Sequence, residues 1–338
     1  MAYHFDTIKL DKGMYQEAGM TFTQVLEKAD PSENYKNTPY EGLDAYQRQL
    51  KRFGIKVKGA GSDRVEKFFT TSQAAVLFPE YVSRSVKTGM VESNILPAIT
   101  ASTTKVDSLD YRSIYSVSNE EFNRPTRLEE GTVIPTTEIA LQENYVRLHK
   151  RGRMLVASYE AVRFQRLDLF SVMLREIGNQ IMRAHLEDAI EVLLNGDGNG
   201  NEAEIVTMAT GESLSYNTLL DFWSRFDPYT MNTILVSPGT MLALLKLPEF
   251  QNPLTGLNFQ GTGELTNPLG AKLIKTAAMA DNKILGLDKN YALEMVQASD
   301  LNVEYDRLID RQLERAAITS ITGFAKIYAG ASKVLETA

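Results

Sequence analysis

The sequence contains no cysteine, three histidines and a single tryptophan. The absence of cysteine excludes disulfides, thiolate metal sites and cysteine nucleophiles. No stretch approaches the roughly 18 apolar residues that a membrane span requires, and residues 1–13 lack the apolar core of a signal peptide. We therefore expect a soluble chain that is not exported, that binds no cofactor or metal, and that has no membrane partner.

The net charge of the chain is also small. The 338 residues carry a formal charge of −7, with 23% charged and 43% hydrophobic residues. These values are ordinary for a globular protein with a substantial core, and the length suits two medium domains or one elaborated domain. The acidic balance argues against a protein whose whole surface binds nucleic acid.

The motifs for catalysis and nucleotide binding are all incomplete. His185 opens an H-x-E sequence, but zinc deaminases also need cysteines downstream, so we interpret it as a helix-surface or interface histidine. Ser237 lies in LVSPG, which lacks the first glycine of a nucleophile elbow. Gly54 and Gly59 have P-loop spacing, but no Lys-Ser or Lys-Thr follows. The sequence therefore predicts that the protein is not an enzyme.

Residues 197–201 (DGNGN) resemble the opening of a calcium-binding loop. Glu202 stands where that loop needs glycine, and Met208 stands where it needs its final glutamate. We interpret the segment as a turn that closes a helix.

The densest basic cluster comprises Arg147, His149, Lys150, Arg151 and Arg153. Two interpretations are open, a nucleic-acid surface or a strand face that pairs with acidic neighbours. Because no second basic run reinforces the cluster, the second interpretation is favoured.

Residues 168–194 predict one long helix. The segment contains no proline and a single glycine, Gly178, with Asp168 as a candidate N-cap and Gly196 just beyond its end. One face carries apolar residues at helical spacing: Phe170, Leu174, Ile177, Ile181, Ala184 and Val192. At 1.5 Å per residue the helix is about 40 Å long and is expected to form a spine.

The remaining elements are short and mixed, which favours an α+β fold. Residues 1–65 predict an appendage with helices near 21–29 and 42–52, followed by a flexible linker at 56–62. Residues 100–155 predict an extended β-hairpin arm with an exposed tip at 119–135 and a long returning strand at 136–157. Further strands are expected at 233–236, 271–275, 283–288, 292–297 and 316–328, and helices at 216–226 and 238–245.

The block from Ala140 to Gly200 resembles the major capsid proteins of tailed bacteriophages, whose fold is named for the Hong Kong 97 phage. An Ala-Ser step at 157–158 leads through a short helix into the long helix, which ends in the turn LLNGDG at 193–198. The later order is also similar, with ILVSP at 234–238 and NPLG at 267–270. The resemblance covers about residues 65–335.

This resemblance implies a Hong Kong 97-type capsid fold with four parts. These are an N-terminal arm (1–65), a peripheral P-domain (66–99, 156–212 and 311–338) with the spine helix at 168–194, an extended loop or E-loop (100–155), and an axial A-domain (213–310). Contacts between subunits are expected in the arm and the extended loop, at Leu43, Tyr46, Leu50, Arg124, Arg127, Glu129 and Glu130.

The resemblance also implies a function. The chain would be a structural major capsid protein that assembles as pentamers and hexamers into an icosahedral shell around the double-stranded DNA genome of a tailed phage. Its partners would be copies of itself, portal and scaffolding proteins, and packaged DNA bound without sequence specificity. It would be located in the virion and assembled in the host bacterial cytoplasm. The alternatives are an encapsulin-type nanocompartment shell and, from other classes, a hydrolase that uses carboxylates or a DNA-binding module.

Overall fold

The computed structural model describes residues 3–17, 19–117, 127, 130, 138–158, 160–161, 164–208, 213–252, 267–308, 310 and 312–337. The chain divides into two units. Unit 1 comprises Met1–Ser93, Arg151–Met182 and Leu301–Ser320, and unit 2 comprises Asn94–Lys150, Arg183–Asp300 and Ile321–Ala338. Four elements contribute residues to both units: α6 (Leu167–Asn195), β4 (Leu148–Ser158), β9 (Leu293–Leu308) and β10 (Leu313–Lys326).

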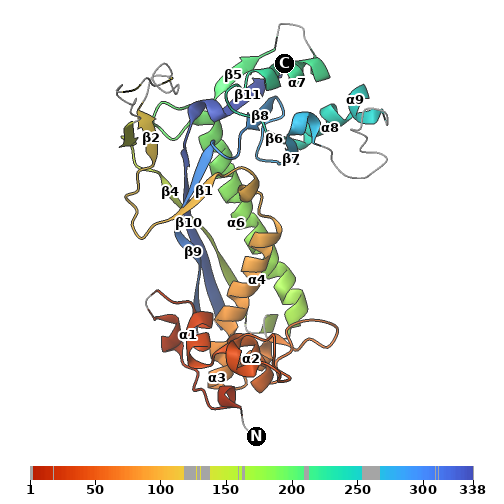
Figure 1. Ribbon diagram of the computed structural model, residues 1–338. Coiled ribbons are helices and arrows are strands. Elements are labelled where there is room, and N and C mark those ends of the chain that lie inside the picture. The colour runs from red at the N-terminus through yellow and green to blue at the C-terminus, as the bar shows by residue number, and fades with distance from the viewer. Residues whose placement is uncertain are drawn as a thin grey trace. The chain divides into compact units, whose positions relative to one another are not determined.

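Unit 1 is mainly helical (Figure 1). Its helices are α1 (Phe22–Ala29), α2 (Ala45–Arg52), α3 (Ser72–Val76) and α4 (Phe78–Glu92), with 3₁₀ turns η1 (His4–Asp6), η2 (Lys12–Tyr15), η3 (Ser32–Tyr35) and η4 (Val65–Phe69). Thr21 and Asp44 start α1 and α2 as N-caps, and each forms a capping box with a glutamine three residues later. The short helices near 21–29 and 42–52 are therefore confirmed.

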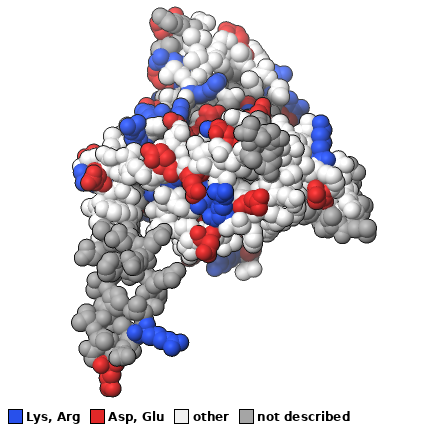
Figure 2. Space-filling view, turned by 90° about the horizontal axis from the view of Figure 1, so that it is seen from above, with Lys and Arg blue, Asp and Glu red and all other residues white. Residues whose placement is uncertain are grey.

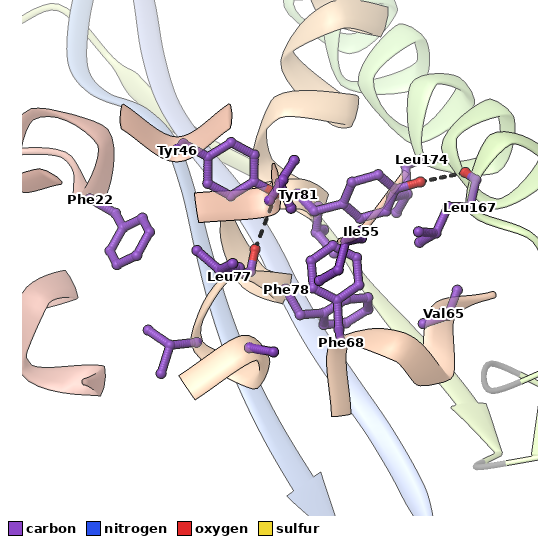
Figure 3. Close-up of a cluster of buried hydrophobic side chains, with 14 of the residues drawn as sticks. Phe22, Tyr46, Ile55, Val65, Phe68, Leu77, Phe78, Tyr81, Leu167 and Leu174 are labelled. Carbon is purple, nitrogen blue, oxygen red and sulfur yellow. Dashed lines mark hydrogen bonds between the residues drawn. The ribbon is translucent and has the colours of Figure 1, made fainter. Parts of the chain in front are cut away.

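The N-terminal helices contribute to the core of unit 1. Phe22, Tyr46 and Leu50 are buried in one cluster that includes aromatic side chains of η4 and α4. Figure 3 shows Tyr46 of this cluster with Phe78 and Tyr81. The Tyr46 hydroxyl donates to the carbonyl of Leu77 at 3.3 Å, and Tyr81 of α4 donates to the carbonyl of Leu167. Residues 1–65 were expected as an appendage, but their apolar side chains are instead buried within their own subunit.

A buried ion pair fixes the segment between α1 and α2. Arg48 is fully buried, and its Nε donates to Asp30 Oδ2 at 2.7 Å while Nη1 donates to the carbonyl of Leu43 at 2.6 Å. The guanidinium lies 4.2 Å from the ring centroid of Tyr35, whose hydroxyl donates to Asp30 Oδ1 at 2.6 Å. Burial, with the bond to Asp30, raises the pKa of Tyr35 to about 12. Removing either charge would leave the other buried without its partner.

Residues 56–62, expected as a flexible linker, form a closed loop. The amide of Lys56 donates to Asp63 Oδ2 at 2.7 Å, and the amide of Asp63 donates back to the carbonyl of Lys56 at 2.8 Å. Arg166 donates to the carbonyl of Ala60 at 2.6 Å. The loop is therefore tied to the segment that precedes α6, and the predicted boundary near residue 65 falls inside unit 1.

Helix α6 confirms the predicted spine, and its single glycine has a packing role. Helices α4 and α6 lie side by side (Figure 1) and approach through Gly89 and Gly178. A Cβ on Gly178 would lie 2.2 Å from the carbonyl oxygen of Val86, and a Cβ on Gly89 would lie 2.0 Å from that of Arg175. Only glycine allows the two backbones to approach so closely.

Unit 2 contains a five-stranded sheet in the order β5-β11-β8-β6-β7. Its strands are β5 (Glu204–Thr207), β11 (Ser332–Glu336), β8 (Lys283–Leu287), β6 (Thr233–Val236) and β7 (Lys272–Lys275). Its helices are α7 (Tyr216–Ser224), α8 (Pro238–Leu245) and α9 (Pro248–Gln251), with 3₁₀ turns η5 (Leu96–Ala98), η7 (Pro268–Gly270) and η8 (Ala329–Ala331). The helices and strands expected at 216–226, 233–236, 238–245, 271–275 and 283–288 are confirmed.

The core of unit 2 explains why these short elements hold together. All four residues of β6 are buried, as expected for a central strand that is covered on both faces. Phe222 of α7 lies against Gly286 of β8, where a Cβ would be 2.8 Å from the ring. Ser237 is buried and caps α8 by accepting from the amide of Thr240 at 3.0 Å, so it is a structural residue.

A four-stranded sheet has the order β1-β9-β10-β4, where β1 is Ser102–Lys105. The strands expected at 292–297 and 316–328 are confirmed as parts of β9 and β10. The long strand expected at 136–157 is instead two strands, β3 (Glu138–Leu141) and β4. Strand β1 pairs in parallel with β9 and does not join the antiparallel ribbon formed by β2 (Ile114–Val117) and β3. The arm is therefore shorter than expected in its described part.

A buried lysine contacts the C-terminal end of α6. Lys326 is fully buried, and its Nζ lies 3.3 Å from the carbonyl oxygen of Leu193. Its amide donates to Asp197 Oδ2 at 2.9 Å, while the amide of Asp197 donates to Asn201 Oδ1 at 3.0 Å. Residues 197–201 are thus the helix-closing turn predicted from the sequence. Burial lowers the pKa of Lys326 to about 8.

We predict that Gly178→Ala destabilises the protein by about 1–3 kcal/mol, because the added methyl group would collide with the backbone of α4. Helix propensity alone would favour alanine by about 1 kcal/mol, so the sign of the change separates the two effects. Urea unfolding measures it. The control is Gly61→Ala, where a Cβ would meet nothing within 4 Å. Equal stability of both variants would contradict the close helix contact.

We predict that Lys326→Met stabilises the protein at pH 7 and changes how stability depends on pH. The folded pKa of Lys326 is about 8, below the ordinary value of 10.5, so the unfolded chain binds more protons between these two values. The wild-type free energy of unfolding therefore rises with pH across that window, by at most about 3 kcal/mol. Urea unfolding at pH 7, 8.5 and 10 should show this rise in the wild type alone. If the free energies of unfolding of the wild type and of Lys326→Met changed with pH in the same way, the lowered pKa of Lys326 would be refuted.

Candidate functional site

The β2–β3 ribbon exposes an apolar face. Ile114 pairs with Leu141 in antiparallel register, and Ile139 lies two residues before Leu141 on the same face. Their exposed fractions are 54%, 61% and 70%, respectively. Ile139 and Leu141 are two residues apart in β3, so both side chains lie on one face of the ribbon. The ribbon thus exposes large apolar side chains of the kind that are usually buried in a hydrophobic core.

The base of the ribbon is anchored by one buried carboxylate. Glu294 of β9 accepts from the hydroxyls of Thr104 at 2.5 Å, Tyr111 at 2.7 Å and Ser113 at 2.5 Å. Ser113 is itself buried, directly before β2. Burial and the bond to Glu294 raise the pKa of Tyr111, so its hydroxyl stays a donor at neutral pH. Charge-assisted bonds of this kind are stronger than neutral ones, and three of them converge here.

A second anchor holds the segment after β3. The side-chain amide of Asn144 donates to the carbonyl of Gly198 at 2.7 Å, and its backbone amide donates to Asn199 Oδ1 at 3.0 Å. The turn that closes α6 therefore also supports the ribbon. Further along, the amide of Val146 donates to the carbonyl of Tyr111 at 2.8 Å. Both ends of the ribbon are consequently fixed within unit 2.

A fixed base with an uncovered apolar face favours a binding surface. A two-stranded ribbon is marginally stable alone in water and gains stability when its face is covered. Contiguous exposed apolar surface in a protein of ordinary composition marks an interaction site. Leu109, 64% exposed, and Tyr145, 50% exposed, lie on segments that flank the ribbon. The ring centroid of Tyr145 lies 4.3 Å from the guanidinium of Arg112.

The residues predicted to contact other subunits fall into three groups. Tyr46 and Leu50 are 3% and 5% exposed within their own subunit, and Leu43 is half-buried. Arg127 and Glu130 are exposed, and Arg124 and Glu129 lie outside the described residues. A contact with a neighbouring subunit stays a prediction for all of them, but Tyr46 and Leu50 have little surface left to offer.

The interpretation of the basic cluster as a strand face with acidic neighbours is supported at one of its residues. His149 of the basic cluster lies 3.3 Å from the buried carboxylate of Asp188, which supports the pairing interpretation for this residue. On the face seen in Figure 2, acidic and basic side chains are interspersed. His185 was expected at a helix surface or an interface, but it is 1% exposed and belongs to the core.

Within the residues that the structure describes, no group of three or more His, Cys, Asp or Glu side chains could hold a metal ion. The Asp197 oxygens accept from the amides of Asn199 and Lys326, so the turn itself uses the carboxylate. Among the same residues, no helix is both long enough and apolar enough to cross a membrane.

Sequence reasoning missed Glu294, Tyr111 and Ser113. Their contacts span more than 180 residues of sequence, and a glutamate inside a strand pattern carries no signal of its distant partners. The exposed apolar face had a visible signal, because isoleucine and leucine alternate in a segment that is otherwise polar.

A sequence model of the family described as phage capsid protein matches residues 142–326, more than half of the chain. A comparison with curated protein sequences gave no match.

Several solved structures are similar in fold. One is a virus-like particle from Pyrococcus furiosus, at 13% identity over 76% of this chain and 98% of that chain, with a TM-score of 0.52. Another is the capsid of a native GTA particle, at 16% identity over 72% and 89%, with a TM-score of 0.54. A third is the capsid of the cyanophage P-SCSP1u, at 14% identity over 70% and 86%, with a TM-score of 0.51. At these identities the likeness establishes the capsid fold, which confirms the predicted fold class.

We predict that Glu294→Ala loosens the base of the ribbon. Removing the carboxylate leaves three hydroxyls without their acceptor, at a cost of about 1–3 kcal/mol. Hydrogen exchange of the amides in 111–117 should accelerate, while exchange in β6 stays unchanged. The control is Glu187→Ala, which removes an exposed carboxylate of α6. Unchanged protection of 111–117 in Glu294→Ala would show that the anchor is not needed.

Proposed function

The chain belongs to the phage capsid protein family, and we propose that it is the major subunit that builds the capsid shell by self-assembly. Copies associate as pentamers and hexamers, which close into an icosahedral shell around double-stranded DNA. In this role the protein is structural and not an enzyme.

The apolar face of the β2–β3 ribbon is the observation that carries this proposal. Ile114, Ile139 and Leu141 are exposed together on a ribbon whose base is fixed, and single exposed apolar residues such as Ile205 and Leu242 lie elsewhere in the described part of the chain. An exposed apolar surface lowers the solubility of a monomer, and it stabilises an assembly when a neighbouring copy covers it. The loop between β2 and β3, with Arg124, Arg127, Glu129 and Glu130, extends this contact onto the neighbour.

The partners follow from the shell. Portal and scaffolding proteins meet the subunit during assembly in the host cytoplasm, and the finished protein resides in the virion. Packaged DNA is held without sequence specificity, and the net charge of −7 limits its adhesion to the wall. In domain terms, residues 100–155 act as the extended loop and residues 213–310 as the axial part. Residues 66–99, 156–212 and 311–338 act as the peripheral part, and residues 1–65 form an arm docked on its own subunit.

The nanocompartment alternative is not favoured, because the family that the chain matches is that of phage capsid proteins. A hydrolase is likewise not favoured, because the matched family is one of phage capsid proteins. The shared fold by itself would not decide between shell types.

We predict that the double change Ile139→Ser and Leu141→Ser leaves the subunit folded but prevents assembly. Both side chains are exposed in the subunit, so their loss costs the monomer little, while the contact with a neighbour loses its apolar centre. Sedimentation velocity should show shells or rings for the wild type and slow-sedimenting subunits for the variant.

Thermal unfolding provides the control for folding, and a matched change at an exposed apolar site elsewhere, Leu242→Ser on α8, controls for general surface polarity. Assembly of Ile139→Ser/Leu141→Ser at wild-type concentration would rule out the ribbon as an essential contact.

A further inference from the structure

The five-stranded sheet of unit 2 ends in two strands of opposite charge. In the described part of the chain, β5 and β7 are its outer strands, so each presents one unpaired row of backbone amides and carbonyls. Both strands run in the same direction, because β5 is parallel to β11, β7 is parallel to β6, and β8 is antiparallel to both β11 and β6. The two edges of one sheet therefore differ in charge and not in strand direction.

The β5 edge is acidic. Glu202 and Glu204 are both exposed, one just before the strand and one within it. Lys333 of the neighbouring strand β11 lies 2.5 Å from Glu204, but the Glu204 side chain remains 54% exposed. One lysine against two carboxylates leaves this edge with net negative charge. Ile205, 55% exposed, gives the same edge an apolar contact point.

The β7 edge is basic. Its sequence is Lys-Leu-Ile-Lys, in which Lys272 and Lys275 are exposed and the two residues between them are buried. Its pairing partners in β6 are the uncharged residues Thr233 and Val236. Two exposed lysines thus lie on the outer strand at the end of the sheet opposite to Glu202 and Glu204, one on each face of the sheet because they are three residues apart.

We infer that the β7 edge of one copy docks against the β5 edge of the next copy, so that the unit 2 sheets follow one another around each ring of subunits. The occupant of each edge is a second copy of this chain, because the two edges complement each other in charge. A two-fold contact would place β7 against β7, or β5 against β5, and would oppose like charges. Only a head-to-tail contact is complementary, and such contacts form a ring when the rotation from one copy to the next closes. The inference rests on the proposed function and adds which surfaces meet.

Lysine on an edge strand also protects against unwanted pairing. Protection alone can use a charge of either sign on each edge, so the charges by themselves do not select a partner. Here one edge carries lysines and the other carries glutamates. This pair of opposite charges attracts a second copy in one orientation and repels it in the others, which is specificity by complementary charge.

Charge reversal tests the contact in the full-length chain. The acidic-edge variant Lys272→Glu/Lys275→Glu has two acidic edges, and the basic-edge variant Glu202→Lys/Glu204→Lys has two basic edges. Each alone should need about tenfold or more protein to assemble, because every contact in the ring now opposes like charges. The control change Lys9→Glu reverses an exposed lysine of unit 1, which contributes no strand to this sheet, and should assemble as the wild type does.

Mixing the two variants gives the sharpest result. An acidic-edge copy and a basic-edge copy attract each other, so they alternate around a ring. Alternation closes only in rings with an even number of members. An equimolar mixture should therefore form six-membered rings but no five-membered ones, as counted by negative-stain electron microscopy. Combining all four changes in one chain restores complementarity and should restore both ring sizes.

The outcomes separate this inference from the proposed function. Suppose that the wild type forms shells and that the acidic-edge and basic-edge variants each assemble at the same protein concentration as the wild type. The edge contact is then wrong, and the shell function stands. Recovery of five-membered rings in the mixture would also overturn the head-to-tail contact. If the wild type forms no rings or shells under any condition, including co-expression with neighbouring genes, the proposed function itself fails. Thermal unfolding of each variant shows that the fold is intact before assembly is scored.

Discussion

A subunit of a shell must keep part of its apolar surface uncovered until a neighbouring copy binds there, and it must stay folded without that contact. This protein meets that constraint by separating the two tasks. Buried side chains form the cores of the two units, while the β2–β3 ribbon carries Ile114, Ile139 and Leu141 outward from a base fixed by Glu294. An apolar surface on a loose segment would collapse onto its own subunit. The hydroxyls around one carboxylate prevent this and keep the surface available to a neighbour.

The rest of the architecture supports that arrangement. Helix α6 ends in the turn at 197–201, and this turn also holds Asn144 beside the ribbon. The buried Lys326 lies under the same turn, so it links the helix end to β10. In unit 1, Gly89 and Gly178 allow α4 and α6 to pack backbone to backbone, and Arg48 fixes the segment between α1 and α2. Few of these contacts lie close together in sequence.

How much the sequence could predict follows from the range of each interaction. The long helix was predictable because its apolar spacing and its glycine exit lie within the helix itself. Strand β6 was predictable because a short apolar run between polar segments is a local signal. The capsid fold class was predictable from the order of such local motifs.

Long-range contacts were not predictable in the same way. The apolar face of the helix that carries Tyr46 and Leu50 was visible in the sequence, but its docking was missed because the surface that buries it is assembled from α3, α4 and η4. The anchor at Glu294 was missed because its partners lie more than 180 residues away. At the candidate site, the alternation of Ile139 and Leu141 was visible, but their exposure depends on tertiary structure.

The most direct test of this account is electron microscopy of the purified wild-type chain, expressed alone and together with the neighbouring genes. The account predicts closed polyhedral shells, or rings of five and six subunits, with unit 2 sheets adjacent around each ring. A homogeneous monomer or dimer under both conditions would contradict it, because the exposed ribbon and the charged sheet edges would then have no second copy to bind.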